Sequence, residues 1–241
     1  MLSLMLALTS SGTAAAQRAL AEVQVKVCSA PQQAITALRL APAKRPRMRV
    51  WLFDTPAFAL QQQGVLVRVR DDGRRVELTI KARVRSCTQM DPRTLGRHGK
   101  CETDLHGEHV QDAVSISSRP RQLQATALLE AEAAYAATLL PDLLTPEQRA
   151  LLDTHASGLT TGLRRYGPAT VDLYDWPGTS AEVEVWTLPG LAPLIEVSQK
   201  STPADAPALR TRLEQQVAAG GLALCDDQRS QTPARLKALA G

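Results

Sequence analysis

Apolar and polar residues alternate strictly along residues 65–84, and this pattern predicts two β-strands. Successive strand side chains point to opposite faces, so each strand has one apolar face and one charged face. Asp72-Gly73 between them is the dipeptide that supplies the positive φ angles of a two-residue hairpin turn. The charged face includes Arg68, Arg70 and Lys81. Pattern alone favours charges in solvent; the alternative is a basic face inside a barrel-like cleft that grips an anion.

Similar patterns along the rest of the chain predict further strands and several helices. Strands are expected at 19–28, 48–54, 113–117, 159–166, 169–175, 181–188 and 193–201. Helices are expected at 30–41, 58–63, 120–152, 207–219 and 232–240. Pro141 breaks the long helical stretch, and Thr145 followed by Pro146 starts a new helix as N-cap and first residue. Residues 86–113 are polar and glycine-containing, which predicts a loop-rich region.

The first sixteen residues carry no charge and pass from apolar to small residues that end in three alanines. This is the pattern of a secretory signal peptide, and a short buried helix is the alternative. The interpretation leaves residues 17–241 as a single domain and predicts a periplasmic or secreted protein. No other run reaches the roughly 18 apolar residues of a membrane span, so none is expected.

The four cysteines agree with export, because an even number permits two disulfides with three possible connectivities. Cys87 and Cys101 flank a polar loop, so we favour that pair. Cys28 and Cys225 would then join the first strand to the C-terminal region. No CxxC pair occurs, and the histidine spacings fit no zinc site.

Composition narrows the class of ligand. Hydrophobic residues make up 44% of the 241 residues, which is enough for a globular core, and the formal net charge is +4. This mild positive charge favours anionic ligands. Aromatic residues make up only 3%, so stacking platforms for single-stranded nucleic acid are not expected. Arginine outnumbers lysine, which suits bidentate contacts to phosphate or carboxylate.

Ionisable residues recur on one face of five predicted strands. They are Glu22 and Lys26; Arg68 and Arg70; Glu77, Lys81 and Arg83; Glu182 and Glu184; and Glu196 and Lys200. If these faces point inward, the basic residues can hold phosphate oxygens and the carboxylates can hold a hard divalent cation such as Mg²⁺ or Mn²⁺. Such a cation would clamp the phosphates and activate a water molecule.

Four motifs in the same order resemble those of the CYTH, or triphosphate tunnel metalloenzyme, superfamily. Residues 22–26, EVQVK, resemble its ExExK signature on the first strand, and residues 53–70 resemble its YFDTP and GxxLRxR segment. Residues 78–81, LTIK, and 195–200, IEVSQK, are similar to two later strands of the family. Residues 101–107, CETDLHG, look like a segment of exported bacterial members. The resemblance covers about residues 20–240.

The resemblance implies an α+β protein with an antiparallel eight-stranded β-tunnel, a charged interior and surrounding helices. It implies hydrolysis of triphosphates or formation of cyclic AMP with Mg or Mn as the metal. By position in the motifs, the catalytic residues would be Glu22, Lys26 and Glu184. The phosphate-binding residues would be Lys26, Arg68, Arg70, Lys81 and Lys200, with Arg165 or Arg164 as a further basic contact. The metal ligands would be Glu22, Glu182, Glu184 and Glu196.

Two departures from the family pattern keep two functions open. Gln24 replaces the second glutamate of ExExK, and Gln231 stands where the family has a lysine before Thr232; both changes remove a charge. One hypothesis is a metal-dependent triphosphate or polyphosphate phosphohydrolase. The other is a tunnel protein that has lost catalysis and binds an anion or a protein partner. Asp54, before Thr-Pro, is interpreted as structural because aspartate can hold such a turn.

Overall fold

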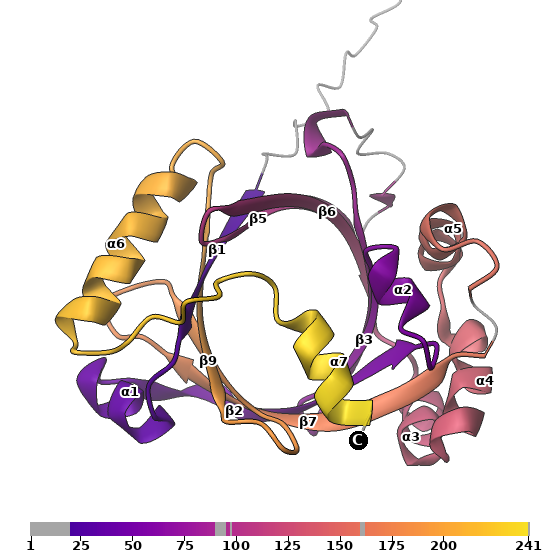
Figure 1. The fold of residues 1–241 in the computed structure, drawn as a ribbon. Helices are drawn as coiled ribbons and strands as arrows, with labels where there is room; N and C mark the ends of the chain where they lie inside the picture. Colours follow the sequence, from indigo (N-terminus) through magenta and orange to yellow (C-terminus); the bar gives the residue numbers. More distant parts are fainter. Residues whose placement is uncertain (1–19, 90–94, 97, 160–161, 241) are drawn as a thin grey trace, which may run out of the picture.

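A ring of β-strands dominates the computed structural model (Figure 1). The structure describes residues 20–89, 95–96, 98–159 and 162–240, so the predicted signal peptide at 1–16 lies outside it. The strands are β1 (Leu20–Val27), β2 (Ala41–Asp54), β3 (Val65–Asp71), β4 (Val76–Arg83), β5 (Gly99–His106), β6 (His109–Ser118), β7 (Arg164–Asp175), β8 (Glu182–Thr187) and β9 (Leu194–Ser201). They close into a barrel in the order β1-β5-β6-β4-β3-β2-β7-β8-β9.

The α+β class and the closed barrel are confirmed, but the expected eight-stranded antiparallel tunnel is wrong in two respects. The described residues form nine strands, and β1 runs parallel to β5, so the sheet is mixed. Strand β5 lies within the region that the sequence predicts as loop. Its alternate residues are charged or polar, so it lacks the apolar alternation that marks a strand.

Two strand boundaries also differ from expectation. Strand β2 begins at Ala41, well before the predicted residue 48, and it pairs with β7 through a register shift between Pro42 and Arg47. An irregularity of this kind lets a proline-containing segment stay within a sheet. Strand β7 is one continuous element where the sequence predicts two.

The β3–β4 hairpin places its apolar face outward and its charged face toward the barrel interior. Val67 and Val69 are fully buried in a core that includes residues of the outer helices. The connection is longer than the predicted two-residue turn, because Asp71 pairs with Val76 and four residues lie between them. Gly73 has φ of +79°. The Asp72 carboxylate accepts the backbone N–H groups of residues 74 and 75, both at 2.9 Å, which stabilises this longer loop.

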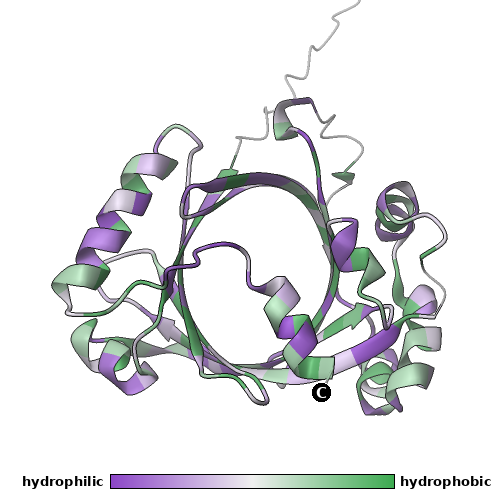
Figure 2. Ribbon diagram, in the orientation of Figure 1, coloured by the Kyte–Doolittle hydropathy of each residue, from purple (hydrophilic) through white to green (hydrophobic). Residues whose placement is uncertain are grey.

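The structure describes seven helices. They are α1 (Pro31–Ala37), α2 (Ala59–Gln62), α3 (Gln122–Glu130), α4 (Ala133–Leu143), α5 (Pro146–His155), α6 (Ala206–Ala219) and α7 (Thr232–Ala240). All except α7, which lies at one opening, pack on the outside of the barrel. Helices α3, α4 and α5 cover one side and α1 and α6 the other, each over its own apolar core (Figure 1). Figure 2 shows hydrophilic and hydrophobic residues mixed along the strands, as expected of strands with two different faces. None of the helices described is long and apolar enough to cross a membrane.

Helix α5 begins as the sequence predicts. Thr145 and Gln148 form a reciprocal capping box, and Pro146 is at the first position. The fully buried Gln148 side chain also donates to the carbonyls of Leu78 at 2.8 Å and Ile116 at 3.0 Å. These bonds tie the helix to strands β4 and β6.

Both favoured disulfides are present in the structure, Cys28–Cys225 and Cys87–Cys101. The first joins the chain just after β1 to the segment between α6 and α7. The Cys225 N–H also donates to the Lys26 carbonyl at 3.0 Å. This segment is hydrophilic and crosses one opening of the barrel on its way to α7 (Figures 1 and 2). The disulfide therefore places C-terminal residues beside the barrel interior.

Candidate functional site

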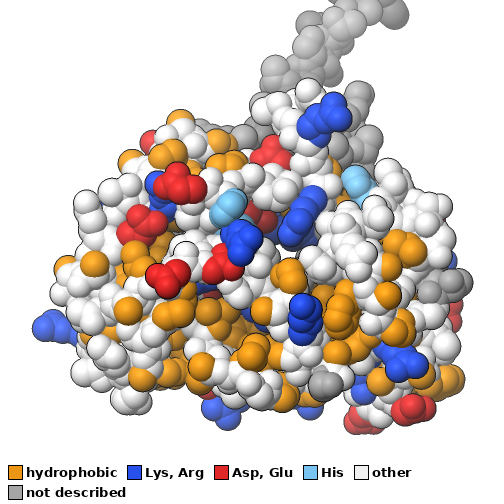
Figure 3. Space-filling view, in the orientation of Figure 1, with side chains coloured by type: hydrophobic (Ala, Val, Ile, Leu, Met, Phe, Trp, Pro, Cys, Tyr) orange, Lys and Arg blue, Asp and Glu red, His pale blue; other side chains and the backbone are white. Residues whose placement is uncertain are grey.

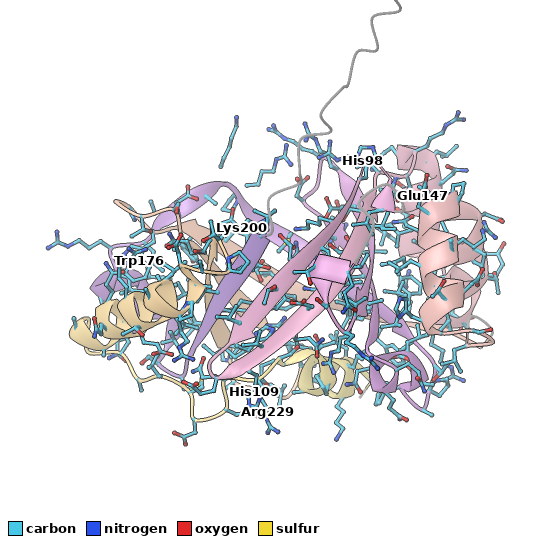
Figure 4. All side chains as sticks on the ribbon, turned by 90° about the horizontal axis from the view of Figure 1, so that it is seen from above. His98, His109, Glu147, Trp176, Lys200 and Arg229 are labelled. Carbon is cyan, nitrogen blue, oxygen red and sulfur yellow. A yellow bond between two sulfur atoms is a disulfide. The ribbon has the colours of Figure 1, made fainter. Side chains whose placement is uncertain are left out.

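A cavity of about 950 Å³ lies inside the barrel. His98 lines it near one end, and His109 and Arg229 line it near the other (Figure 4). Acidic, basic and histidine side chains gather over one opening (Figure 3). The lining contains as many Asp and Glu side chains as Lys and Arg side chains. Of the predicted site residues, the cavity is lined by Glu22, Arg68, Arg70, Lys81, Glu182, Glu184, Glu196 and Lys200.

One side of the cavity, which we call the basic wall, consists of Arg68, Arg70, Lys81 and Arg83 on β3 and β4. Arg68 makes no ion pair with the carboxylates that the structure describes, and its Nε atom is buried without a hydrogen-bond partner. Burial, followed by the neighbouring charge of Arg70, lowers the pKa of Arg68 to about 9. The surroundings therefore disfavour the charged guanidinium, and an anion in the cavity would stabilise it.

The side formed by β8 and β9, which we call the acidic wall, carries Glu182, Glu184 and Glu196. Glu184 Oε1 lies 3.5 Å from Arg70 Nη2, and its other oxygen accepts from Trp186 Nε1 at 2.8 Å. Glu196 Oε2 accepts from Arg235 Nη2 at 3.0 Å. The Arg235 guanidinium also stacks over the Trp186 ring, 3.8 Å from its centroid. Two of the three carboxylates are thus held by side chains of the protein itself.

Lys26 is on β1, opposite Glu196 in the β1–β9 register, and is not among the residues that line the cavity. Its side chain has no exposed surface, and its Nζ lies 3.9 Å from Glu196 Oε2. Nζ also donates to the Gln228 carbonyl at 3.0 Å and to His106 Nδ1 at 3.3 Å. Burial lowers the pKa of Lys26, and burial together with the Lys26 charge lowers the pKa of His106 to about 4. The predicted phosphate contact from Lys26 is therefore not formed in this arrangement.

A third group of charges lies where β1 runs beside β5. Glu22 is opposite Asp104 in the register, and Asp104 is paired with Lys81. Glu102 is 2.6 Å from the ammonium of Lys100 and 3.4 Å from that of Lys200. Burial raises the pKa of Glu22; Lys81 opposes this, and Asp104 and Glu102 add to it.

Sequence reasoning missed the β5 side chains in this group and the contribution of α7. The signal on β5 was visible as charged or polar residues at alternate positions, although no apolar alternation accompanies them. These are Lys100, Glu102, Asp104 and His106. Arg235 carried no such signal, because only the folded chain brings α7 to the end of the barrel.

The four predicted metal ligands do not converge. Glu184 and Glu196 are opposite one another in the β8–β9 register, but Arg70 and Arg235 respectively lie against them. Glu182 on β8 is opposite Ser198. Glu22 is on β1, so strand β9 lies between Glu22 and Glu182. No three acidic, histidine or cysteine side chains of the described part are arranged to hold a metal ion. As folded, this donor set does not fit the divalent cation that the resemblance implies.

Two other predicted residues lie outside the cavity lining. Arg165 donates to the carbonyls of Leu128 and Leu129, both at 2.7 Å, at the end of α3. It satisfies orphan helix carbonyls there and does not reach the basic wall. Asp54 accepts the N–H groups of Thr55, Leu60 and Gln61 at 2.7–2.9 Å. Its structural role is confirmed, since it holds the turn and the start of α2.

No family model and no curated protein sequence matches the chain. Solved structures do match. A Hippeastrum protein, described as a candidate adenylyl cyclase with a dominant triphosphatase activity, has a TM-score of 0.59 and 15% identity over 90% of this chain and 94% of its own. A candidate adenylate cyclase from Bacillus halodurans has a TM-score of 0.58 and 12% identity, covering 88% and 96%. Another from Vibrio parahaemolyticus has a TM-score of 0.52 and 12% identity, covering 92% and 100%. The chain therefore shares the fold of these solved structures, and the closed barrel that the sequence resemblance implies is confirmed.

Proposed function

We propose that the tunnel binds a small phosphate-rich anion, such as inorganic triphosphate or a short polyphosphate. The observation that carries this proposal is Arg68. It is a cation that faces a closed cavity without a carboxylate partner in the described structure, and its Nε lacks any hydrogen bond. A buried donor atom without a hydrogen-bond partner is costly, so such atoms are normally paired. A phosphate oxygen would supply the missing partner.

The neighbours of Arg68 suit a ligand with several anionic oxygens. Arg70 shares its strand face, and its Nε is also buried without a partner. Thr79 lies opposite Arg68 and Glu77 opposite Arg70 in the β3–β4 register, and the Thr79 hydroxyl is hydrogen-bonded to the Ser117 hydroxyl at 2.8 Å. Arginine presents a planar set of donors that matches phosphate oxygens in pairs. A chain of phosphate groups could therefore contact both guanidinium groups at once.

The position of Arg68 inside the barrel indicates what kind of ligand is bound, and the disulfides indicate in which compartment the protein is found. The free cation is inside a barrel, whereas proteins that bind single-stranded nucleic acid use an open basic groove with aromatic platforms. We therefore propose a small-molecule ligand and no nucleic acid. Two disulfides are compatible with an oxidising compartment. A periplasmic or secreted location follows as part of the proposal.

Isothermal titration calorimetry with sodium triphosphate tests the binding function. The native protein should bind, and Arg68→Met should weaken the affinity at least about tenfold, because a hydrogen bond to a charged group contributes roughly 1.5–3 kcal/mol. Arg74→Met is the matched control, since this exposed arginine lies in the hairpin loop away from the cavity lining. Absence of binding by the native protein, or equal losses in both variants, would contradict the proposal.

Hydrolysis of the bound anion is a second candidate function. It is favoured by Glu22, a cavity-lining carboxylate whose pKa is raised by burial, because a carboxyl group with a raised pKa can serve in proton transfer near neutral pH. The triphosphatase activity described for the Hippeastrum protein supports the same idea. Glu184, which also lines the cavity, is a further candidate; Lys26 would first have to leave its buried contacts.

Phosphate release from triphosphate, measured with Mg²⁺ and with Mn²⁺, tests this second function. If the protein is a hydrolase, Glu22→Gln should lose phosphate release while triphosphate affinity in calorimetry stays within about threefold. No release by the native protein with either metal would reject hydrolysis and leave the binding function standing.

A further inference from the structure

Four carboxylates that line the tunnel are already engaged by cations of the chain. Arg235 Nη2 is 3.0 Å from Glu196 Oε2, and Arg70 Nη2 is 3.5 Å from Glu184 Oε1. Near β5, Glu102 is paired with Lys100 and Lys200, and Asp104 is paired with Lys81. At least one oxygen of each of these four carboxylates, which a hard divalent cation would need as a ligand, is thus engaged by an ammonium or guanidinium group, and the other Asp104 oxygen is buried without a hydrogen-bond partner.

We infer that the tunnel binds its polyanion without a divalent cation, because side chains of the protein occupy the carboxylates that would hold one. This inference rests on the proposed binding function and specifies its ligand as the metal-free polyanion. It departs from the metal dependence that the sequence resemblance implies.

Arg235 is the most firmly placed of these internal cations. Its side chain is only 12% exposed, it donates to Glu196, and it stacks on Trp186. A guanidinium group does not lose its proton in proteins, so it cannot yield its place by becoming neutral. For a metal ion to bind Glu196, the Arg235 side chain would have to leave both Glu196 and Trp186. Glu196 would then only exchange the guanidinium for the metal ion.

Gln24 is a neutral side chain at the position where the ExExK signature has its second glutamate, which would be another candidate ligand for the cation. It lines the cavity on β1, opposite Ser198 on one neighbouring strand and His106 on the other. A carboxamide oxygen is a neutral and weaker ligand than a carboxylate. Glu22 and Glu182, which make no ion pair with described residues, are separated by strand β9. They therefore cannot replace the missing pair of ligands.

Charge balance gives a third reason. The lining contains equal numbers of acidic and basic side chains, so a divalent cation would add two positive charges beside Arg68 and Arg70. Arg68 makes no ion pair among the described residues, so an anionic ligand could contact it directly, whereas a cation beside it would be repelled.

Two measurements on the native protein test the inference. In calorimetry with sodium triphosphate at fixed ionic strength, affinity in EDTA should equal or exceed that in excess Mg²⁺, since Mg²⁺ sequesters free triphosphate. Without triphosphate, the six-line electron paramagnetic resonance signal of aqueous Mn²⁺ should keep its intensity when the protein is added. Binding that requires Mg²⁺, or that strengthens tenfold with it, would overturn the inference, as would loss of the Mn²⁺ signal.

Failure of binding in both buffers would instead contradict the proposed function, so the two ideas fail differently. A double variant tests the cause of metal exclusion. Gln24→Glu combined with Arg235→Met adds one carboxylate and frees another, and it should reduce the Mn²⁺ signal at least twofold at equal concentrations. A folded double variant that leaves the Mn²⁺ signal unchanged would show that these two residues do not exclude the cation, and the inference would fall.

Discussion

The basic wall on β3 and β4 and the acidic wall on β8 and β9 line the same cavity but satisfy their charges in different ways. On the acidic wall, Glu196 has Arg235 at 3.0 Å and Lys26 at 3.9 Å as partners. On the basic wall, Arg68 makes no ion pair among the described residues. Arg70 links the two sides through Glu184 at 3.5 Å.

This difference separates charges that hold the fold from charges that await a ligand. A buried ion pair is strongly stabilising only relative to a state in which one partner is missing, because the remaining charge is then desolvated and unpaired. A buried cation that has no partner to begin with gives up folding stability that a ligand can restore. Mutation of Glu196 on the acidic wall should therefore change stability, and mutation of Arg68 on the basic wall should change binding.

Glu196→Gln should have the largest effect on stability. It leaves Lys26, which has no exposed surface, and Arg235 without a charged partner. We expect the free energy of unfolding in urea to fall by about 3 kcal/mol, the size found when one partner of a buried pair is removed.

Two further variants show whether the loss of stability comes from the position of Glu196 in the buried acidic wall or would follow the removal of any charged side chain. Glu108→Gln removes an 87%-exposed carboxylate that pairs with Arg210, and it should cost less than about 1 kcal/mol. Arg68→Met should leave unfolding free energy unchanged or slightly higher, because it removes a partly buried cation that makes no ion pair with described residues and whose Nε lacks a hydrogen bond. Equal losses in Glu196→Gln and Arg68→Met would erase the distinction between the walls.

The sequence was sufficient for the basic wall because its signal is local. Strict alternation along residues 65–84, with Arg68 and Arg70 on one face, was enough to define two strands and their charged side. Alternation by itself cannot say whether that face is concave. The other charged strands and their order along the chain supplied that information, since together they matched a tunnel family.

The acidic side was less predictable because its arrangement depends on distant partners. Arg235 reaches Glu196 only because the chain after Cys225 crosses the barrel opening before α7. Strand β5 was missed because Lys100 and Glu102 interrupt any apolar alternation. Arg165 or Arg164 was expected as a further phosphate contact because one of the two lies on each face of the strand, whereas in the structure the Arg165 guanidinium donates to the carbonyls of Leu128 and Leu129.

Protonation of His106 on β5 at acidic pH should lower the free energy of unfolding, and this is the second largest effect that we expect. Burial and Lys26 lower its pKa to about 4, against about 6.5 for an unfolded chain. Between these values the unfolded state binds a proton that the folded state does not, so stability falls as pH decreases from 6.5 to 4. Relative to His106→Asn, the native protein should lose about 2 kcal/mol more over this range.

Urea unfolding at several pH values measures this difference. His109→Gln is the matched control, because this exposed histidine is on the adjacent strand β6 and also lines the cavity. It should retain the pH dependence of the native protein. A His106→Asn variant with that same pH dependence would mean that the Lys26–His106 contact is not maintained in solution.

Lys200→Met should have the smallest effect and marks how far the ligand-binding surface extends. The Lys200 side chain is 57% exposed and lies 3.4 Å from Glu102, which keeps Lys100 as a partner at 2.6 Å. Exposed pairs contribute about 0–1 kcal/mol, so unfolding free energy should change little and triphosphate affinity should fall less than about fivefold. Calorimetry with triphosphate on Lys200→Met and on Arg68→Met compares the two losses of affinity. A loss in Lys200→Met as large as that in Arg68→Met would mean that the ligand spans the cavity from β3 to β9, and the basic wall would no longer be confined to one side.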